Sequence, residues 1–244
     1  MLVLLAAGML VAAFGYASVG HGGASAYLGA MALAGVAPQE VRPIALALNL
    51  IVSGIATLKF QRAGHFRWRL FWPFAAVSIP LAFVGGAVAL PSQAYRLLVA
   101  AVLLYAAAQL WRSGRAGDEL RPVREPPIPA AMAIGAGMGL LAGLTGVGGG
   151  IFLSPLLLML GWAGTKQTSA VAAPFILVNS IAGLLAVVAL QGASLPQHFW
   201  ALGLAVLLGG WLGAEYGSRR FADPLVRRVL AVVLALAGGK MVLV

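Results

Sequence analysis

Residues 14–23 read Phe-Gly-Tyr-Ala-Ser-Val-Gly-His-Gly-Gly, and a related stretch, Ala-Gly-Leu-Thr-Gly-Val-Gly-Gly-Gly, returns at residues 142–150. The two copies lie about 128 residues apart, and the sequence that follows each copy also matches. Asn49, for example, has a counterpart in Asn179. A duplicated unit with a glycine-rich break inside apolar sequence is typical of membrane proteins built from internal repeats.

The composition indicates a bilayer as the solvent. Hydrophobic residues make up 61% of the chain and charged residues only 9%, and the mean hydropathy is +0.97. A soluble protein could not cover its exterior with so few polar groups, whereas a bilayer requires an apolar exterior. The chain has no cysteine, which excludes a disulfide framework and a metal site built on thiolates. We therefore expect lipid around the protein and no nucleic acid, metal or cofactor bound to it; the sequence leaves a homo-oligomer open.

Each half is predicted to contain two short apolar segments beside its glycine break and then three longer ones. The short segments fall below the ~20 residues that cross ~30 Å of hydrocarbon, so a helical hairpin or broken helix is expected there. The ten segments are residues 2–18, 24–37, 41–60, 70–90 and 92–111, then 129–145, 151–162, 170–190, 199–217 and 224–244. The predicted fold class is an all-α polytopic membrane protein with repeats at residues 1–112 and 129–244, joined by a cytoplasmic linker at 113–128.

The positions of the basic residues predict the orientation. Thirteen of the 16 lysines and arginines lie between residues 59 and 69, in the linker, between the last two segments, or at Lys166. The loop at 191–198, which matches the loop at 59–69, contains no lysine or arginine. By the positive-inside rule, the loop at 59–69 is cytoplasmic and the loop at 191–198 is external. The halves then have inverted topology and both termini are external. Only Arg42, Arg96 and Lys240 fall outside this pattern.

The glycine breaks are the first candidate for a substrate site. We expect helices to begin just after them, at Ala24 and Ile151, with partial positive charge and free N–H groups directed at the centre of the protein. Such a site suits an anion. The alternative is that these glycines only let helices pack closely; we prefer that reading for scattered glycines such as Gly8 and Gly209. The candidate binding residues in the breaks are Gly20, His21, Gly22, Gly23, Gly148, Gly149 and Gly150.

His21 and three side chains outside the breaks are candidates for binding or proton coupling. His21 could donate to an anion or carry a proton, or it could be neutral and bonded to a carbonyl of the turn. Asn49 and Asn179 could line a cavity, or they could only bond neighbouring helices. Glu215 could couple a proton, but an ion pair with Arg219 at i+4 is favoured.

Several stretches resemble the sulfite exporter TauE/SafE family over essentially the whole chain. They are residues 146–156, 166–167 and 175–180 in the second half, and residues 20–23, 48–49 and 62–66 in the first. The resemblance implies secondary transport of small anions of sulfur metabolism, or of organosulfonates, in the bacterial inner membrane. One departure is Ala172-Ala173-Pro174, where many members carry a small hydroxyl motif. We therefore do not transfer a specific set of sulfite-binding residues from the family to this chain.

The predicted function is that of a secondary transporter for a small anion, sulfite or a related sulfur compound, and not of an enzyme. The alternatives are a passive anion channel and a membrane-embedded accessory or enzyme subunit. No nucleotide-binding P-loop and no catalytic set of residues is present in the sequence.

Overall fold

The computed structural model describes residues 2–113, 124–196, 199–219 and 224–243, and all elements in these ranges are helices. The first half contains α1 (Leu2–Ala17), α2 (Ala24–Leu33), α3 (Pro38–Arg62), α4 (Trp68–Ala87) and α5 (Ser92–Ser113). The second half contains α6 (Ile128–Thr145), α7 (Gly150–Met159), α8 (Thr165–Gln191), α9 (Phe199–Arg219) and α10 (Pro224–Leu243). Each of the ten predicted segments is a helix, so the all-α fold class is confirmed.

Five of the described helices are long and apolar enough to span a membrane: α3, α4, α6, α8 and α9. Helices α5 and α10, which were also predicted to span, have 22 and 20 residues but are not among these five. Helices α2 and α7 have 10 residues each, which corresponds to about 15 Å, or half of the hydrocarbon thickness. The two short helices therefore reach only part of the way across a bilayer.

The predicted end of the second segment at residue 37 is wrong, because α2 stops at Leu33. Gly35 adopts φ 77°, and the amides of Gly35 and Val36 bond the carbonyls of Ala32 and Met31. This is a Schellman motif, which ends a helix and satisfies its last carbonyls. The other short helix, α7, ends in the same way at Gly161.

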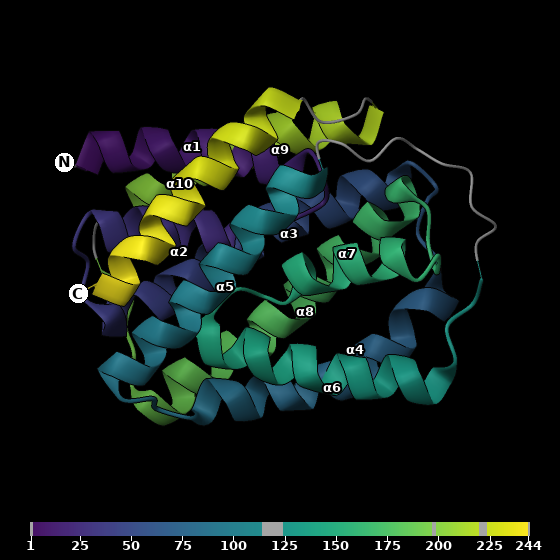
Figure 1. Ribbon diagram of the computed structural model, residues 1–244, viewed down its shortest axis with the longest axis horizontal. Helices are drawn as coiled ribbons and strands as arrows, with labels where there is room; N and C mark the ends of the chain where they lie inside the picture. Colours follow the sequence, from purple (N-terminus) through teal and green to yellow (C-terminus); the bar gives the residue numbers. More distant parts are fainter. Residues whose placement is uncertain (1, 114–123, 197–198, 220–223, 244) are drawn as a thin grey trace.

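The helices of the two halves pack in reciprocal pairs. Helix α1 packs on α9 as α6 packs on α4, and α3 packs on α8 at the centre, with α5 on α10. Figure 1 shows that α1 begins and α10 ends at the same end of the molecule. This pairing is what two related halves produce, but the inverted topology of the halves and the repeat boundaries at residues 112 and 129 stay predictions.

Glycines form the contact faces of the two outer pairs. In each pair three glycines spaced four residues apart lie against backbone carbonyls of the facing helix or, for Gly217, of the residue that follows it, so that an added Cβ would collide with them. Such close approach of small residues is a common mode of helix packing in membranes. The glycines are Gly209, Gly213 and Gly217 of α9, facing α1, and Gly135, Gly139 and Gly143 of α6, facing α4. The packing role is thereby confirmed for Gly209, but it is wrong for Gly8, because a Cβ added there would meet no atom of another described segment within 4 Å.

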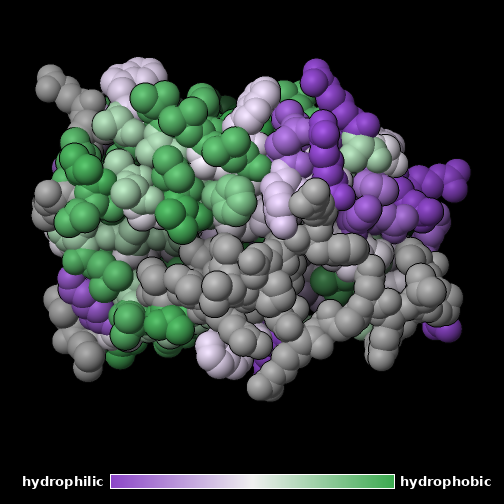
Figure 2. Space-filling model, turned by 90° about the horizontal axis from the view of Figure 1, so that it is seen from above, coloured by the Kyte–Doolittle hydropathy of each residue, from purple (hydrophilic) through white to green (hydrophobic). Residues whose placement is uncertain are grey.

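The surface is polarised along the long axis. Figure 2 shows hydrophobic residues over much of the visible face and hydrophilic ones gathered toward one end. The exposed residues Arg62 at the end of α3, Arg67 in the following loop and Arg69 in the first turn of α4 lie at the end of the molecule opposite to the start of α1. Large apolar side chains are exposed elsewhere, with Leu4 and Trp200 each 79% exposed. An apolar belt with a basic end matches a membrane protein. Arg115, Arg121 and Arg220 lie outside the described residues, as do the side chains of Arg227 and Arg228.

The interior contains two apolar cores. The larger one is formed mainly by α1, α2, α3, α5, α9 and α10, with Ile151 of α7 and two alanines of α8, and the smaller one by α4, α6, α7 and α8. The residues of the two glycine breaks, 18–23 and 146–149, are buried, except for Val19 and His21, which are partly buried. This places both breaks inside the protein.

Candidate functional site: two glycine breaks joined at Asn49

The first glycine break is a tight turn between α1 and α2. Gly20 adopts φ 76°, and the amides of Gly20 and His21 bond the carbonyls of Ala17 and Tyr16, which ends α1 in a Schellman motif. Gly23 adopts φ 89° and is the N-cap of α2, which begins at Ala24 as predicted. Glycine is favoured at both positions because L side chains rarely adopt such φ values.

The second break has more left-handed glycines. Gly146, Gly148 and Gly149 adopt φ values of 84°, 77° and 81°. Gly149 is the N-cap of α7, which begins at Gly150, one residue earlier than the predicted start at Ile151. Both breaks therefore direct the N-terminus of a short helix into the protein, as the sequence predicted.

Asn49 joins the two breaks. This side chain of α3 is fully buried. Its Oδ1 accepts a hydrogen bond from the amide of Ala24, at 3.1 Å, and so caps the start of α2. Its Nδ2 donates to the carbonyl of Val147 in the second break, at 3.2 Å, and to Ser180 Oγ of α8, at 3.3 Å. One amide thus holds the start of α2, the second break and α8 together.

The glycines around Asn49 leave no room for a side chain. A Cβ on Gly22 would lie 2.9 Å from Asn49 Cγ and 3.0 Å from Ile176 Cγ2. A Cβ on Gly148 would lie 2.8 Å from both Asn49 Nδ2 and Ile176 Cγ2. The breaks, about 128 residues apart in sequence, therefore meet on the same two side chains.

Asn179 is the sequence counterpart of Asn49, but it has different partners. It is fully buried on α8, and its Nδ2 donates to the carbonyl of Phe175 one turn earlier, at 2.8 Å. Its Oδ1 has no hydrogen-bond partner in the described part of the chain. The equivalent sequence positions thus do not have equivalent bonds. A role of either asparagine in substrate binding stays a prediction.

His21 lies within the first break and is half-buried. Its Nδ1 lies 3.0 Å from the carbonyl oxygen of Val19, and its ring meets the ring of Tyr16 edge-on at 6.3 Å. This contact with a turn carbonyl is the one expected if His21 is a neutral residue that only stabilises the turn. A binding or proton-carrying role for His21 stays a prediction.

Glu215 forms the predicted ion pair with Arg219, at 2.6 Å, and a second pair with Lys59 that the sequence did not reveal. Lys59 comes from α3 and also lies over the ring of Trp211, 4.2 Å from its centroid. Glu215 therefore ties α9 to α3 near the basic end of the molecule. No local sequence spacing links residues 59 and 215, so only the packing of α3 on α9 could reveal this pair.

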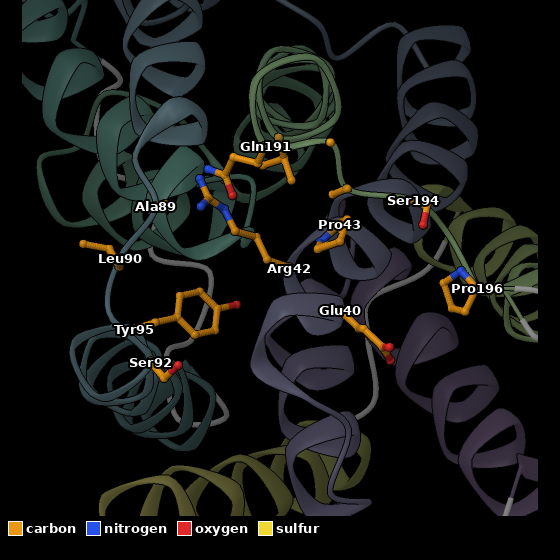
Figure 3. A pocket seen from close by; sticks show the side chains of 13 residues that line it. Glu40, Arg42, Pro43, Ala89, Leu90, Ser92, Tyr95, Gln191, Ser194 and Pro196 are labelled. Atoms are coloured by element: carbon orange, nitrogen blue, oxygen red, sulfur yellow. The ribbon is translucent and has the colours of Figure 1, made fainter.

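The sequence reasoning missed one further polar site, which surrounds Arg42. A cavity of about 430 Å³ lies between the start of α3, the ends of α4 and α8, the start of α5 and the loop after α8. Arg42 of α3, Tyr95 of α5 and Gln191 of α8 line it (Figure 3). The sequence pointed to Arg42 in one way only, because it is one of three basic residues that do not follow the charge pattern.

Comparisons with known proteins agree with this architecture. The family model of the sulfite exporter TauE/SafE matches residues 4–241. The chain is 40% identical over 240 residues to a probable membrane transporter protein, y4hK, of Sinorhizobium fredii, covering 97% of this chain and 96% of the relative. It is 29% identical over 205 residues to a probable membrane transporter protein, ORF9, of a Sinorhizobium species, covering 83% and 76%. No solved structure matches significantly. The chain is a multi-pass membrane protein and belongs to the sulfite exporter TauE/SafE family.

Proposed function

We propose that this protein is a secondary transporter that moves a small anion, sulfite or a related sulfur oxyanion or organosulfonate, across the bacterial inner membrane. The observation that carries the proposal is the meeting of the two glycine breaks at the buried amide of Asn49. Transporters with internal repeats bind substrate where interrupted helices meet near the midplane of the bilayer.

The electrostatics of the breaks favour an anion. The N-termini of α2 and α7 carry the positive ends of their helix dipoles and amides that the helix itself leaves unpaired. The side chains that the break glycines would touch are neutral, except for Arg42 beside Gly146, which is cationic. A metal or organic cation would find no carboxylate there among the described residues. The backbone amides at the starts of α2 and α7, together with Arg42, therefore favour an anionic substrate.

Family membership supports the transport of sulfur compounds. The matching model carries the name of a sulfite exporter, and both relatives are named as probable membrane transporters. The departure at Ala172-Ala173-Pro174 is the reason for proposing a class of anions and not sulfite alone.

The orientation proposed with this function places the loop between α3 and α4 in the cytoplasm and both termini in the periplasm. The basic residues of that loop and the pair of Lys59 and Arg219 around Glu215 lie at one end of the helices, which supports this orientation.

The test is uptake of radiolabelled anion into proteoliposomes, with protein-free liposomes as background. A panel of sulfite, thiosulfate, sulfoacetate and taurine is first ranked by thermal stabilisation of the purified protein, since a ligand of the native state raises the melting temperature. Saturable uptake of the best ligand is expected. Uptake that rises linearly with concentration would indicate a channel instead, and chemical turnover without uptake would indicate an enzyme.

A further inference from the structure

Arg42 is a buried cation without a described counter-ion. The residue is 5% exposed, and no carboxylate among the described residues lies within ion-pair distance of it. Its Nη1 donates to the carbonyl of Val88 at 3.1 Å, and its Nη2 donates to the carbonyls of Gly85, at 2.6 Å, and Gly143, at 2.5 Å. Carbonyl dipoles orient the guanidinium, but they do not neutralise its charge. A buried charge without an opposite charge is costly.

Two of the five N–H donors of the guanidinium are left over. The three bonds account for one hydrogen of Nη1 and both hydrogens of Nη2, so Nε and the second hydrogen of Nη1 remain. Nε is buried and has no hydrogen-bond partner among the residues that the structure describes. The planar fork of arginine suits oxyanions, which accept from neighbouring N–H groups.

The cavity beside Arg42 has the size and the polar groups for a small oxyanion with some water. Gln191 lies next to Arg42, because its Nε2 donates to the carbonyl of Gly86 at 2.8 Å while Arg42 bonds Gly85 (Figure 3). Tyr95 donates to the carbonyl of Thr145 at 3.3 Å, and its oxygen can still accept a bond. The acidic residue of the lining, Glu40, is exposed at the first turn of α3 and its carboxylate points away from Arg42 in Figure 3.

Arg42 also connects this cavity to the second glycine break. A Cβ on Gly146 would lie 3.2 Å from Arg42 Cγ, and both Arg42 and Tyr95 bond carbonyls just before the break. The counterpart in the second half is Ala173, which precedes Pro174 as Arg42 precedes Pro43. The cation is therefore present in only one half.

We propose that the cavity lined by Arg42, Tyr95 and Gln191 is an anion-recognition site that receives a sulfonate or sulfur oxyanion from the external side and passes it to the second glycine break. The loop at 191–196 and the junction of α4 and α5, which border the cavity, lie at the end opposite to the basic loop. The proposal rests on the proposed transport function for its substrate class, and it assigns to that function a separate entry site.

Single-cysteine labelling tests the site without any need for transport. The chain has no cysteine, so Ser194→Cys in the cavity lining introduces the sole thiol. Right-side-out membrane vesicles are treated with the impermeant anionic methanethiosulfonate ethylsulfonate or with its cationic trimethylammonium analogue. The ratio of the two labelling rates reports the local potential.

We expect Arg42→Gln to lower the ratio of anionic to cationic labelling rates at residue 194 roughly tenfold. Arg42→Lys keeps the positive charge and should leave this ratio within about twofold of the wild-type value. Glu40→Gln removes a negative charge and should raise the ratio. Leu195→Cys, exposed but outside the cavity lining, is the matched control and should respond much less. An unchanged ratio in both Arg42→Gln and Glu40→Gln would overturn the proposal, as would labelling only in inside-out vesicles. If Arg42→Gln does not yield folded protein, Glu40→Gln decides alone.

Uptake measurements then separate this proposal from the transport function. Arg42→Gln should raise the KM for sulfite about tenfold or more while the maximal rate changes less, because the entry site contributes binding. An absence of uptake by the wild-type protein would contradict the proposed transport function. The labelling experiment would still test the anion site, because it does not depend on transport. Wild-type uptake with an unchanged KM in Arg42→Gln would overturn the entry site.

Discussion

The side chain of Asn49 accepts a hydrogen bond from the amide of Ala24, 3.1 Å away, and so fixes the start of α2. The same side chain donates to Val147 in the other half of the molecule. The residues flanking these contacts are glycines, because any Cβ on Gly22 or Gly148 would collide with Asn49. This arrangement links a duplicated sequence motif to one buried polar junction.

Replacement of Asn49 by leucine should be much more costly than the same replacement of Asn179. Asn49→Leu removes a helix cap and leaves buried backbone groups unpaired, which costs about 2–3 kcal/mol of the free energy of unfolding. Asn179→Leu removes one bond, from Nδ2 to the carbonyl of Phe175, and an oxygen that has no partner in the described part of the chain, so a smaller cost of about 1 kcal/mol is expected. Thermal melting of the two purified variants measures the difference.

Equal losses in the two variants would show that the asymmetry between the asparagines is not real. Uptake gives a second comparison. If Asn179 Oδ1 contacts substrate during transport, Asn179→Leu lowers uptake although the protein stays folded.

The two glycines Gly139 and Gly137 provide a matched pair on α6. Gly139→Ala would press a methyl group into the backbone of Ser78 on α4 and should cost about 1–3 kcal/mol. A Cβ added to Gly137 would meet no atom of another described segment within 4 Å, so Gly137→Ala should be neutral or stabilise the helix by up to about 1 kcal/mol. Melting temperatures in detergent check both, and a stable Gly139→Ala variant would contradict the close packing of α4 on α6.

The pair of Lys59 and Glu215 should hold α3 against α9. Glu215→Gln is expected to lower the melting temperature, and the exchange of both charges in Lys59→Glu with Glu215→Lys should recover part of the loss. The loss should diminish at high ionic strength because these side chains are partly exposed. A Glu215→Gln variant with wild-type stability but with uptake that no longer depends on a proton gradient would favour proton coupling by Glu215 instead.

His21 is best tested by the pH dependence of uptake. If the imidazole carries a proton or donates to the anion in its charged form, His21→Gln should remove a pH dependence that the wild-type protein shows near neutrality. If its bond to Val19 is its only role, His21→Gln should leave the shape of the pH profile unchanged. Uptake rates between acidic and mildly alkaline pH, with Asn as a second replacement, distinguish these results.

The sequence was sufficient to predict the ten helices and the two breaks, because apolar length and left-handed glycines are local properties. The end of α2 at Leu33 was missed since Gly35 acts as a stop only through its Schellman turn. The duplication suggested equal roles for Asn49 and Asn179, but the partners of each side chain depend on which groups of other helices and turns lie within hydrogen-bond distance of it. Repeated sequence therefore predicts shared architecture better than shared contacts.

The polar sites formed between distant helices could not be predicted. Arg42 was visible only as an exception to the charge pattern, because its partners Gly85 and Gly143 come from α4 and α6. Lys59 and Glu215 are 156 residues apart. Such contacts depend on which helices pack against α3, and the hydropathy pattern of the sequence does not specify these neighbours.

Counterflow is the most direct test of the transport claim. Proteoliposomes are preloaded with unlabelled sulfite and diluted into a trace of labelled sulfite, with protein-free liposomes as background. A carrier accumulates label transiently above the outside concentration. This accumulation should vanish in Gly22→Val, because the added side chain collides with Asn49. It should persist in Gly54→Ala, because the added Cβ meets no atom of another described segment within 4 Å. Label that only equilibrates, or that enters Gly22→Val vesicles as fast as wild-type ones, would contradict a carrier built on the two glycine breaks.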